Sequence, residues 1–206
     1  YIPNFEEYYH SIHGALSEAQ HVFINNGLEA ISKKEVSVLE MGFGTGLNTY
    51  LTCLENKKLL KEITYMALEA YPIDPDLANQ MEYIEIIDSK DGEAIFKKIH
   101  QCSWNNKNII DQFFTLQKLE VAIQDVSFQK TFDLVYYDAF SPRVQPELWT
   151  EEIFDKLYTV MNLNGILVTY CAKGSVKRAL NSVGFEVESL AGPPGKREMT
   201  RAKKTK

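Results

Sequence analysis

A glycine-rich turn is the first part of this sequence whose residue types and spacing could do chemistry. Gly42, Gly44 and Gly46 follow an apolar run at 36–41 and precede a helix-like segment at 47–55. Glycine lets the backbone turn sharply and lets a ligand approach the main chain closely. The start of the following helix offers free N–H groups. The turn therefore predicts a site for a nucleotide-like molecule.

The spacing of the glycines narrows the class of ligand. The dinucleotide fingerprint G-x-G-x-x-G would place its third glycine at Leu47. The chain also lacks G-x-x-x-x-G-K-[ST], which argues against a nucleoside triphosphate. G-x-G-x-G after a strand that ends in an acid, here Glu40, is similar to the first motif of S-adenosylmethionine (SAM) methyltransferases. A tight turn without a ligand is the competing interpretation, because short glycine loops are weak motifs.

Acidic residues end four of the predicted strands: Glu40, Glu69, Asp125 and Asp138. Ligands of open α/β sheets bind beyond the carboxyl ends of strands. Glu69 is predicted to bind a ribose diol, Asp125 the adenine amino group, and Asp138 to face the methyl donor. A single acid at a strand end is often a cap or turn residue. Four acids beside a glycine loop favour a binding site.

The pattern of the whole chain predicts one α/β domain over residues 1–206, with an N-terminal entry segment at 1–30 and an irregular insertion at 100–117. The expected sheet has seven mostly parallel strands, of which the last is antiparallel. They are placed at 36–41, 63–70, 118–125, 131–138, 165–172, 185–191 and 196–202. Helices are expected at 46–55, from Asp74 onward, and at 92–102, 146–161 and 174–184. Only residues 126–130 separate the third strand from the fourth, which is too short for a crossover helix.

Composition argues against several other classes of protein. No apolar run approaches the roughly 20 residues that a membrane helix needs. Cys53, Cys102 and Cys171 are widely spaced and form no C-x-x-C pair. This pattern predicts free thiols in a reducing compartment, with neither zinc nor disulfides. We therefore expect a cytoplasmic protein that has no metal and no membrane partner.

Longer stretches carry a more specific resemblance. They are MGFGTGLN (41–48), LEAYP (68–72), YYDAFSP (136–142), PELWTEEIF (146–154), GILVTYCAKGSVKRAL (165–180) and KREM (196–199). Together with HSIHGALSEAQHVFINNGL (10–28), they resemble in order and spacing the methyltransferase domain of the MnmC family. The resemblance covers nearly the full chain.

The resemblance implies a Rossmann-like class I SAM-dependent methyltransferase fold, with SAM as cofactor. It implies methylation of the aminomethyl group of 5-aminomethyl-2-thiouridine, a wobble uridine of tRNA, with the anticodon stem-loop as partner. No counterpart of the family's FAD-dependent oxidoreductase half is visible, so we expect a stand-alone methyltransferase supplied by a separate enzyme. The implied cofactor contacts are Glu40, Gly42, Gly44, Gly46, Asn48, Glu69 and Asp125. Gln124 departs from the family's Gly-x-Asp usage at the end of the third strand.

Methyl transfer to an amine needs a neutral nucleophile, whereas a free alkyl amine titrates near ~10. Asp138 is the predicted catalytic residue, because a carboxylate can accept an amine N–H and stabilise the charge that grows on nitrogen. Phe140 and Pro142, with Tyr136 and Tyr137, are predicted to frame the uracil ring. Alternation along the strand would instead bury one of the two tyrosines.

The other aromatic and histidine residues are assigned lesser roles. Trp149 and Phe154 have a helical spacing that favours core packing. His10 and His13 are placed near the entrance of the cofactor pocket, whereas His21 and His100 are interpreted as non-catalytic.

Charge is unevenly distributed along this chain of net charge −6. Residues 173–206 hold 9 Lys and Arg against 3 Asp and Glu, whereas residues 1–172 hold 13 against 25. The asymmetry is typical of a basic patch on an acidic body, and a solvated tail would give the same composition. The expected contacts to tRNA phosphates are Lys173, Lys177, Lys196 and Arg197.

Two other functions fit parts of the sequence. A spermidine-synthase-like aminopropyltransferase shares the fold, and FDLVYYDAFSP (132–142) resembles the catalytic strand of that class. A SAM- or tRNA-binding module without catalytic activity is the alternative outside the enzymes. The intact glycine loop, Glu69 and Asp138 argue against this second alternative.

Overall fold

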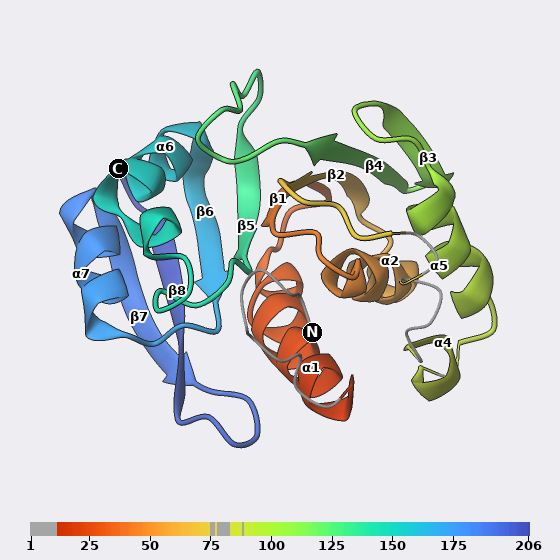
Figure 1. Cartoon of the computed structure of the whole chain (residues 1–206), viewed down its shortest axis with the longest axis horizontal. Coiled ribbons are helices and arrows are strands. Elements are labelled where there is room, and N and C mark those ends of the chain that lie inside the picture. The colour runs from red at the N-terminus through yellow and green to blue at the C-terminus, as the bar shows by residue number, and fades with distance from the viewer. Residues whose placement is uncertain (1–11, 75–76, 78–82, 88) are drawn as a thin grey trace.

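The computed structural model describes residues 12–74, 77, 83–87 and 89–206. These residues fold into three layers, in which helices cover both faces of one eight-stranded sheet (Figure 1). The strand order is β3-β4-β2-β1-β5-β6-β8-β7. The strands are β1 Glu35–Met41, β2 Glu62–Glu69, β3 Lys107–Asp111, β4 Phe114–Glu120, β5 Phe132–Tyr137, β6 Met161–Thr169, β7 Phe185–Ala191 and β8 Glu198–Lys204.

Strand pairing places the carboxyl ends of the central strands at one edge of the sheet. β1 pairs in parallel with both β2 and β5, while β4 and β6 extend the parallel sheet on either side. β8 is antiparallel to β6 and to β7, between which it lies. The predicted antiparallel last strand is therefore confirmed.

The two core clusters lie on opposite faces of the sheet because side chains alternate along each strand. In β5, Leu134 and Tyr136 point into one cluster, whereas Val135 and Tyr137 point into the other. All four side chains are fully buried. Both faces are apolar, as expected of parallel strands that helices cover on both sides.

The helices follow the same division. The first cluster is covered by α1 Ile12–Ala19, a π-helical turn Gln20–Asn25, a 3-10 turn Leu28–Ala30, α2 Leu47–Leu59, α4 Tyr83–Ile86 and α5 Gly92–Gln101. The second is covered by a 3-10 turn Pro146–Trp149, α6 Glu151–Val160 and α7 Gly174–Ser182. Trp149 and Phe154 belong to this second core, as predicted.

The helix predicted at 146–161 is interrupted at Thr150. This residue has an extended backbone, with φ −93° and ψ 160°, and its side chain accepts a hydrogen bond from the Ile153 N–H. Thr150 is therefore the N-cap of α6, which separates that helix from the 3-10 turn before it. The helix predicted from Asp74 onward lies mostly outside the described residues.

The prediction that residues 100–117 form an irregular insertion is wrong. Its second half forms β3 and the start of β4, which pair as an antiparallel hairpin at the edge of the sheet. The predicted strand at 118–125 is displaced, because β4 already ends at Glu120. The hairpin accounts for the eighth strand. The absence of a helix between β4 and β5 is confirmed, since residues 121–131 form turns and loops.

Three further observations concern the described residues. No helix among them has both the length and the apolar character needed to span a bilayer. They contain no cluster of His, Cys, Asp and Glu side chains suited to a metal ion. Cys53, Cys102 and Cys171 are free cysteines, as the sequence predicted.

Candidate active site

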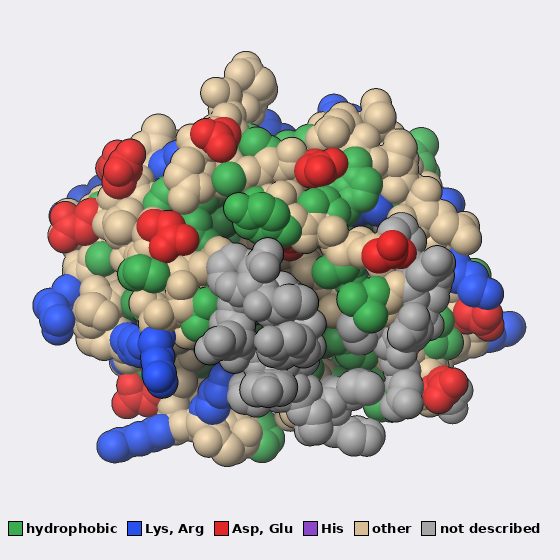
Figure 2. Space-filling view, in the orientation of Figure 1, with side chains coloured by type: hydrophobic (Ala, Val, Ile, Leu, Met, Phe, Trp, Pro, Cys, Tyr) green, Lys and Arg blue, Asp and Glu red, His purple; other side chains and the backbone are tan. Residues whose placement is uncertain are grey.

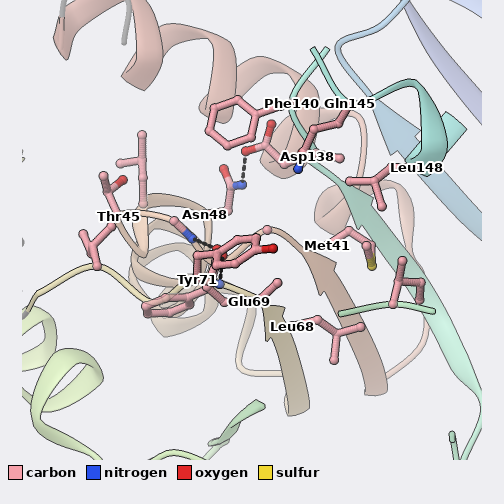
Figure 3. A pocket seen from close by; sticks show the side chains of 18 of the residues that line it. Met41, Thr45, Asn48, Leu68, Glu69, Tyr71, Asp138, Phe140, Gln145 and Leu148 are labelled. Atoms are coloured by element: carbon pink, nitrogen blue, oxygen red, sulfur yellow. Dashed lines mark hydrogen bonds between the residues drawn. The ribbon is translucent and has the colours of Figure 1, made fainter. Parts of the chain in front are cut away.

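A cavity of about 650 Å³ lies beyond the carboxyl ends of β1, β2 and β5. Its walls include the glycine loop, the segment after β2, residues 121–124 after β4, and residues 138–140 after β5. Side chains from α1 and the β7–β8 turn complete the lining. Figure 3 shows Asp138, Phe140 and Gln145 on one side of this cavity and Glu69 with Tyr71 on another.

The glycine loop joins β1 to α2 through backbone conformations that favour glycine. Gly42 has a φ of +86°, and a Cβ at this position would lie 2.8 Å from the carbonyl oxygen of Asp138. Gly44 has a φ of +51°, and a Cβ there would meet no heavy atom within 4 Å. The loop thus packs tightly against the end of β5 at Gly42 and leaves its backbone open at Gly44.

Glu69 holds the loop from the end of β2. Its Oε2 accepts a hydrogen bond from the Gly44 N–H at 2.9 Å, and its Oε1 accepts one from the Tyr71 N–H at 2.9 Å. Burial raises the pKa of the Glu69 carboxyl, while the hydrogen bonds from Gly44 and Tyr71 oppose this shift. Each carboxylate oxygen retains a second acceptor site for a hydroxyl group.

Asp138 follows β5 directly and lines the cavity. Its Oδ2 accepts a hydrogen bond from the Asn48 side-chain amide at 2.8 Å (Figure 3). Burial raises the pKa of Asp138 to about 7. The Asn48 hydrogen bond and the charge of Lys196 lower this pKa, whereas the charge of Glu18 raises it. Asp138 therefore changes its protonation state near neutral pH.

Aromatic side chains fix the segment that carries Asp138. The Trp149 indole N–H donates to the Phe140 carbonyl oxygen at 2.8 Å, and the Tyr170 hydroxyl donates to the Ala139 carbonyl oxygen at 2.8 Å. Phe140 and Tyr170 also line the cavity. The segment after β5 is thus anchored to the 3-10 turn at 146–149 and to the residue that follows β6.

Glu40 lies beneath the cavity and is absent from its lining. It is completely buried, and its Oε2 accepts a hydrogen bond from the Thr49 hydroxyl at 2.7 Å. Its Oε1 has no partner among the described residues. Burial raises the pKa of Glu40 to about 8, and the hydrogen bond from Thr49 opposes that shift.

Comparisons with known proteins identify the family. Residues 92–205 match the model of a family described as S-adenosyl-L-methionine-dependent methyltransferases. The chain belongs to this family. It is a SAM-dependent methyltransferase with the predicted Rossmann-like fold.

The chain is similar to the tRNA 5-methylaminomethyl-2-thiouridine biosynthesis bifunctional protein MnmC of Cupriavidus metallidurans. The two are 27% identical over 98% of this chain and 32% of the relative. The structure resembles that of MNMC2 from Aquifex aeolicus, with a TM-score of 0.72, 22% identity, and coverage of 90% of this chain and 59% of the other. The chain therefore spans about a third of the length of its curated relative.

A weaker structural likeness concerns spermidine synthase from Thermotoga maritima. It has a TM-score of 0.56 and 15% identity, and covers 93% of this chain and 61% of that one. This likeness shows a shared fold alone. The aminopropyltransferase alternative therefore has no support beyond the fold.

The residues present fit SAM as the cofactor of this methyltransferase. The open backbone at Gly44 and the Glu69 carboxylate lie together at one part of the cavity. The cavity volume of about 650 Å³ is in the range of small-molecule sites. We call the glycine loop 42–46 and Glu69 the cofactor end, and Asp138, Phe140, Tyr170, Glu18 and Lys196 the acceptor end.

The structure brings most of the predicted cofactor residues together, but it separates Asp125 from them. Asp125 is exposed and does not line the cavity. The prediction that it ends the third strand is wrong, because β4 stops at Glu120 and residues 123–125 form a turn. Ile123 and Gln124 line the cavity at this point instead.

The predicted ring-stacking residues are also only partly gathered. Phe140 lines the cavity, whereas Pro142 does not. Tyr136 and Tyr137 are both fully buried and belong to the two core clusters. The prediction that they frame the uracil ring is therefore wrong. The side chains of His10 and His13 lie outside what the structure describes.

The predicted phosphate contacts fall into two groups. Lys173 and Arg197 are exposed. Lys177 donates to the Ser189 hydroxyl oxygen at 2.6 Å and to Glu198 at 2.8 Å. Lys196 forms an ion pair with Glu18, and its Nζ lies 4.8 Å from the centroid of the Tyr170 ring.

Sequence reasoning missed Glu18 and Tyr170 as parts of the site. Glu18 lies within the N-terminal stretch that carried the family resemblance, but no motif distinguished it from other surface acids. Tyr170 follows β6 and lies in the run 165–172 that was predicted as a strand, where nothing in the sequence marked it as a site residue. Both side chains line the cavity.

Proposed function

We propose that this methyltransferase transfers the methyl group of SAM to the aminomethyl group of 5-aminomethyl-2-thiouridine at the wobble position of tRNA. The observation that carries the proposal is the Asp138 carboxyl, which lines the cavity and has a pKa raised to about 7 by burial. The name of the Cupriavidus metallidurans relative refers to 5-methylaminomethyl-2-thiouridine, a nucleoside with a methylated aminomethyl group. This name supports the choice of acceptor.

Bound at the cofactor end, SAM supplies a methyl group carried on a positively charged sulfur. Glu69 would hold the ribose hydroxyls through its carboxylate oxygens, and the open backbone at Gly44 would allow close approach. These contacts orient the donor, and orientation is a large part of the acceleration in group transfer.

Asp138 receives the amine. Asn48 holds Oδ2 at 2.8 Å, which fixes the carboxylate and leaves Oδ1 to accept an N–H from the amine. A carboxylate that titrates near 7 can take a proton from an arriving ammonium at neutral pH more readily than an ordinary aspartate. Its negative charge then stabilises the positive charge that grows on nitrogen.

Aromatic rings shield the acceptor end and offer flat faces to a base. Phe140 and Tyr170 line the cavity beside Asp138. Stacking on aromatic side chains is the usual way in which proteins hold a base outside a helix. We assign Phe140 to the uracil ring on this ground.

The tRNA docks on the basic C-terminal region. Figure 2 shows Lys and Arg side chains over the part of the molecule where Figure 1 places α7 and the β7–β8 hairpin. Lys173, Arg178 and Arg197 are exposed here and suit phosphate contacts, while Lys177 and Lys196 are held in ion pairs.

A substrate panel tests this proposal. Purified protein and SAM are incubated with tRNA carrying 5-aminomethyl-2-thiouridine, with the same tRNA lacking the aminomethyl group, and with free aminomethyl nucleoside. Nucleosides are then identified by mass. A single added methyl on the aminomethyl nucleoside of the first tRNA supports the proposal. Methylation of the second tRNA, or transfer from decarboxylated SAM to putrescine, would replace it with another function.

A further inference from the structure

An ion pair joins opposite ends of the chain at the acceptor end of the cavity. Glu18 of α1 contacts the Nζ of Lys196 in the β7–β8 turn, and both residues line the cavity. A second link runs beside it, because the His21 side-chain nitrogen lies 2.8 Å from the Ala191 carbonyl oxygen. The pair is thus held in a defined position.

Asp138 faces titratable or hydrogen-bonding groups from five elements of the fold. Among the described residues, they are Glu40 at the end of β1, Asn48 of α2 as hydrogen-bond donor, Tyr83 of α4, Glu18 of α1 and Lys196 of the β7–β8 turn. Glu40 is buried beneath the cavity, and Asn48 is uncharged. Glu18 and Lys196 instead line the cavity together with Asp138.

We propose that Glu18 and Lys196 are positioning residues that set, with opposite signs, how tightly the Asp138 carboxylate holds a proton. A neighbouring carboxylate favours the protonated form of Asp138, and a neighbouring ammonium favours the ionised form. Glu18 and Lys196 also restrain each other, so each charge stays at a fixed place. The inference rests on the proposed function only for its effect on methyl transfer.

The partial burial of Glu18 and Lys196 bears on how strongly their charges act on the Asp138 pKa. Burial is the largest cause of the raised Asp138 pKa, followed by the opposing Asn48 hydrogen bond, and Glu18 and Lys196 follow with opposite contributions. The side chains of Glu18 and Lys196 are 20% and 35% exposed, so solvent screens them only in part. Their contributions to the Asp138 pKa have opposite signs.

The consequence for catalysis follows from the needs of the acceptor. If Asp138 held its proton too tightly, it would already be protonated when the amine arrives and could not accept a proton from the ammonium. If it held the proton too loosely, it would be a weak base. Glu18 and Lys196 together keep Asp138 between these limits near neutral pH.

Carbon-13 NMR titration of the Asp138 carboxyl in the free protein tests the inference without any substrate. Aspartate is labelled at the carboxyl carbon, and Asp138→Asn identifies the signal. Glu18→Gln should lower the Asp138 pKa by about 0.5 unit or more, and Lys196→Met should raise it by a similar amount. The double variant should titrate near the parent, and Lys196→Arg should restore the parent value.

A matched control uses the ion pair between Glu188 and Arg201 on the same hairpin. Glu188→Gln and Arg201→Met should leave the Asp138 titration unchanged. Shifts in the same direction for Glu18→Gln and Lys196→Met, or no shift in either, would reduce the pair to a structural clasp and overturn the inference.

The pH profile of methyl transfer gives the second readout. Its acidic limb should move down in Glu18→Gln and up in Lys196→Met, as the NMR titration does. The two proposals can fail separately. If the Asp138 pKa falls in Glu18→Gln and rises in Lys196→Met as expected, but the protein methylates no aminomethyl tRNA, the proposed function is refuted and this inference stands. If the acidic limb of the pH profile stays in place while the Asp138 pKa shifts, the pair has no part in the reaction.

Discussion

The cofactor end and the acceptor end of one cavity are held in place by different means. At the cofactor end, Glu69 accepts hydrogen bonds from the backbone of Gly44 and Tyr71, and the loop lies between adjacent strands. At the acceptor end, Asp138, Tyr170 and the Glu18–Lys196 pair come from distant segments joined by side-chain contacts. Substitutions should therefore separate cofactor binding from transfer.

The largest expected effect is at Asp138. Asp138→Asn should slow single-turnover methyl transfer by about 10²–10⁴-fold, the usual span for a positioned acid–base group. SAM affinity by calorimetry should stay within about threefold, because Asp138 lies at the acceptor end. The exposed Asp155 of α6 provides the control, and Asp155→Asn should behave as the parent. A normal rate in Asp138→Asn would remove the acceptor end from the mechanism.

Glu69 tests the other end of the comparison. Glu69→Ala should weaken SAM binding by roughly 2–4 kcal/mol, because charge-assisted hydrogen bonds to the ligand and support for Gly44 are both lost. This corresponds to an increase of about 30- to 1000-fold in the dissociation constant. Glu120 ends the neighbouring strand and is exposed, so Glu120→Ala should leave affinity unchanged. Equal affinities in both variants would contradict the assignment of the cofactor end.

Glu40 sharpens the comparison because it lies beneath both ends. Its pKa is raised from 4.5 to about 8 by burial, so the folded protein keeps a proton that the unfolded chain loses. The free energy of unfolding should therefore fall as pH rises from about 4.5 to 8 and level off above. Glu40→Gln should remove this contribution and gain stability relative to the parent, on the order of a few kcal/mol at high pH.

Chemical denaturation at pH 5 and pH 9 measures this difference. Parent and Glu40→Gln should be closest in stability at pH 5 and furthest apart at pH 9. An advantage of the variant that shrinks with rising pH would show that Glu40 is ionised in the folded protein.

The smallest effect is expected on tRNA association. Lys173, Arg178 and Arg197 are exposed, and changing all three to Glu should flatten the dependence of log affinity on log salt by about 2–3, at roughly 0.7–0.9 per phosphate contact. SAM affinity should not change. Lys90→Glu, Lys97→Glu and Lys107→Glu together give the same charge change elsewhere on exposed residues. A larger loss in this control set would place the tRNA on the other side of the molecule.

The sequence predicts the cofactor end well because that end is local in the chain. The run at 36–41, the glycine positions and the acid that ends β2 are neighbours in one strand-loop-helix unit and the strand beside it. Positive φ values at Gly42, Gly44 and Gly46 confirm why glycine stands there.

Sequence prediction fails where an apolar residue lies outside a strand or a polar residue lies within one. The apolar residues of 118–125 suggested a strand up to Asp125, but the strand ends at Glu120 and residues 121–123 line the cavity. β3 was missed because an edge strand tolerates the polar residues of Lys107–Asp111. Tyr136 looked available to a substrate, yet helices cover both faces of β5.

At the acceptor end, Asp138 and Phe140 were predicted from the sequence, but the Glu18–Lys196 pair has no local sequence pattern. Glu18 and Lys196 stand near opposite ends of the chain, and the sequence assigned Lys196 to tRNA phosphates and Glu18 to no role. Their contact exists because α1 and the β7–β8 turn meet beside the end of β5. Only the tertiary arrangement reveals such a pair.

Rescue by excess cofactor tests the central claim most directly. Single-turnover methyl transfer to aminomethyl tRNA is measured for Glu69→Ala and Asp138→Asn over a range of SAM concentrations. The two-ended cavity predicts that the Glu69→Ala rate rises toward the parent rate as SAM saturates, while the Asp138→Asn rate stays at least about 100-fold lower at every concentration. Recovery of Asp138→Asn by SAM, or a Glu69→Ala rate that remains low at saturation, would contradict the account.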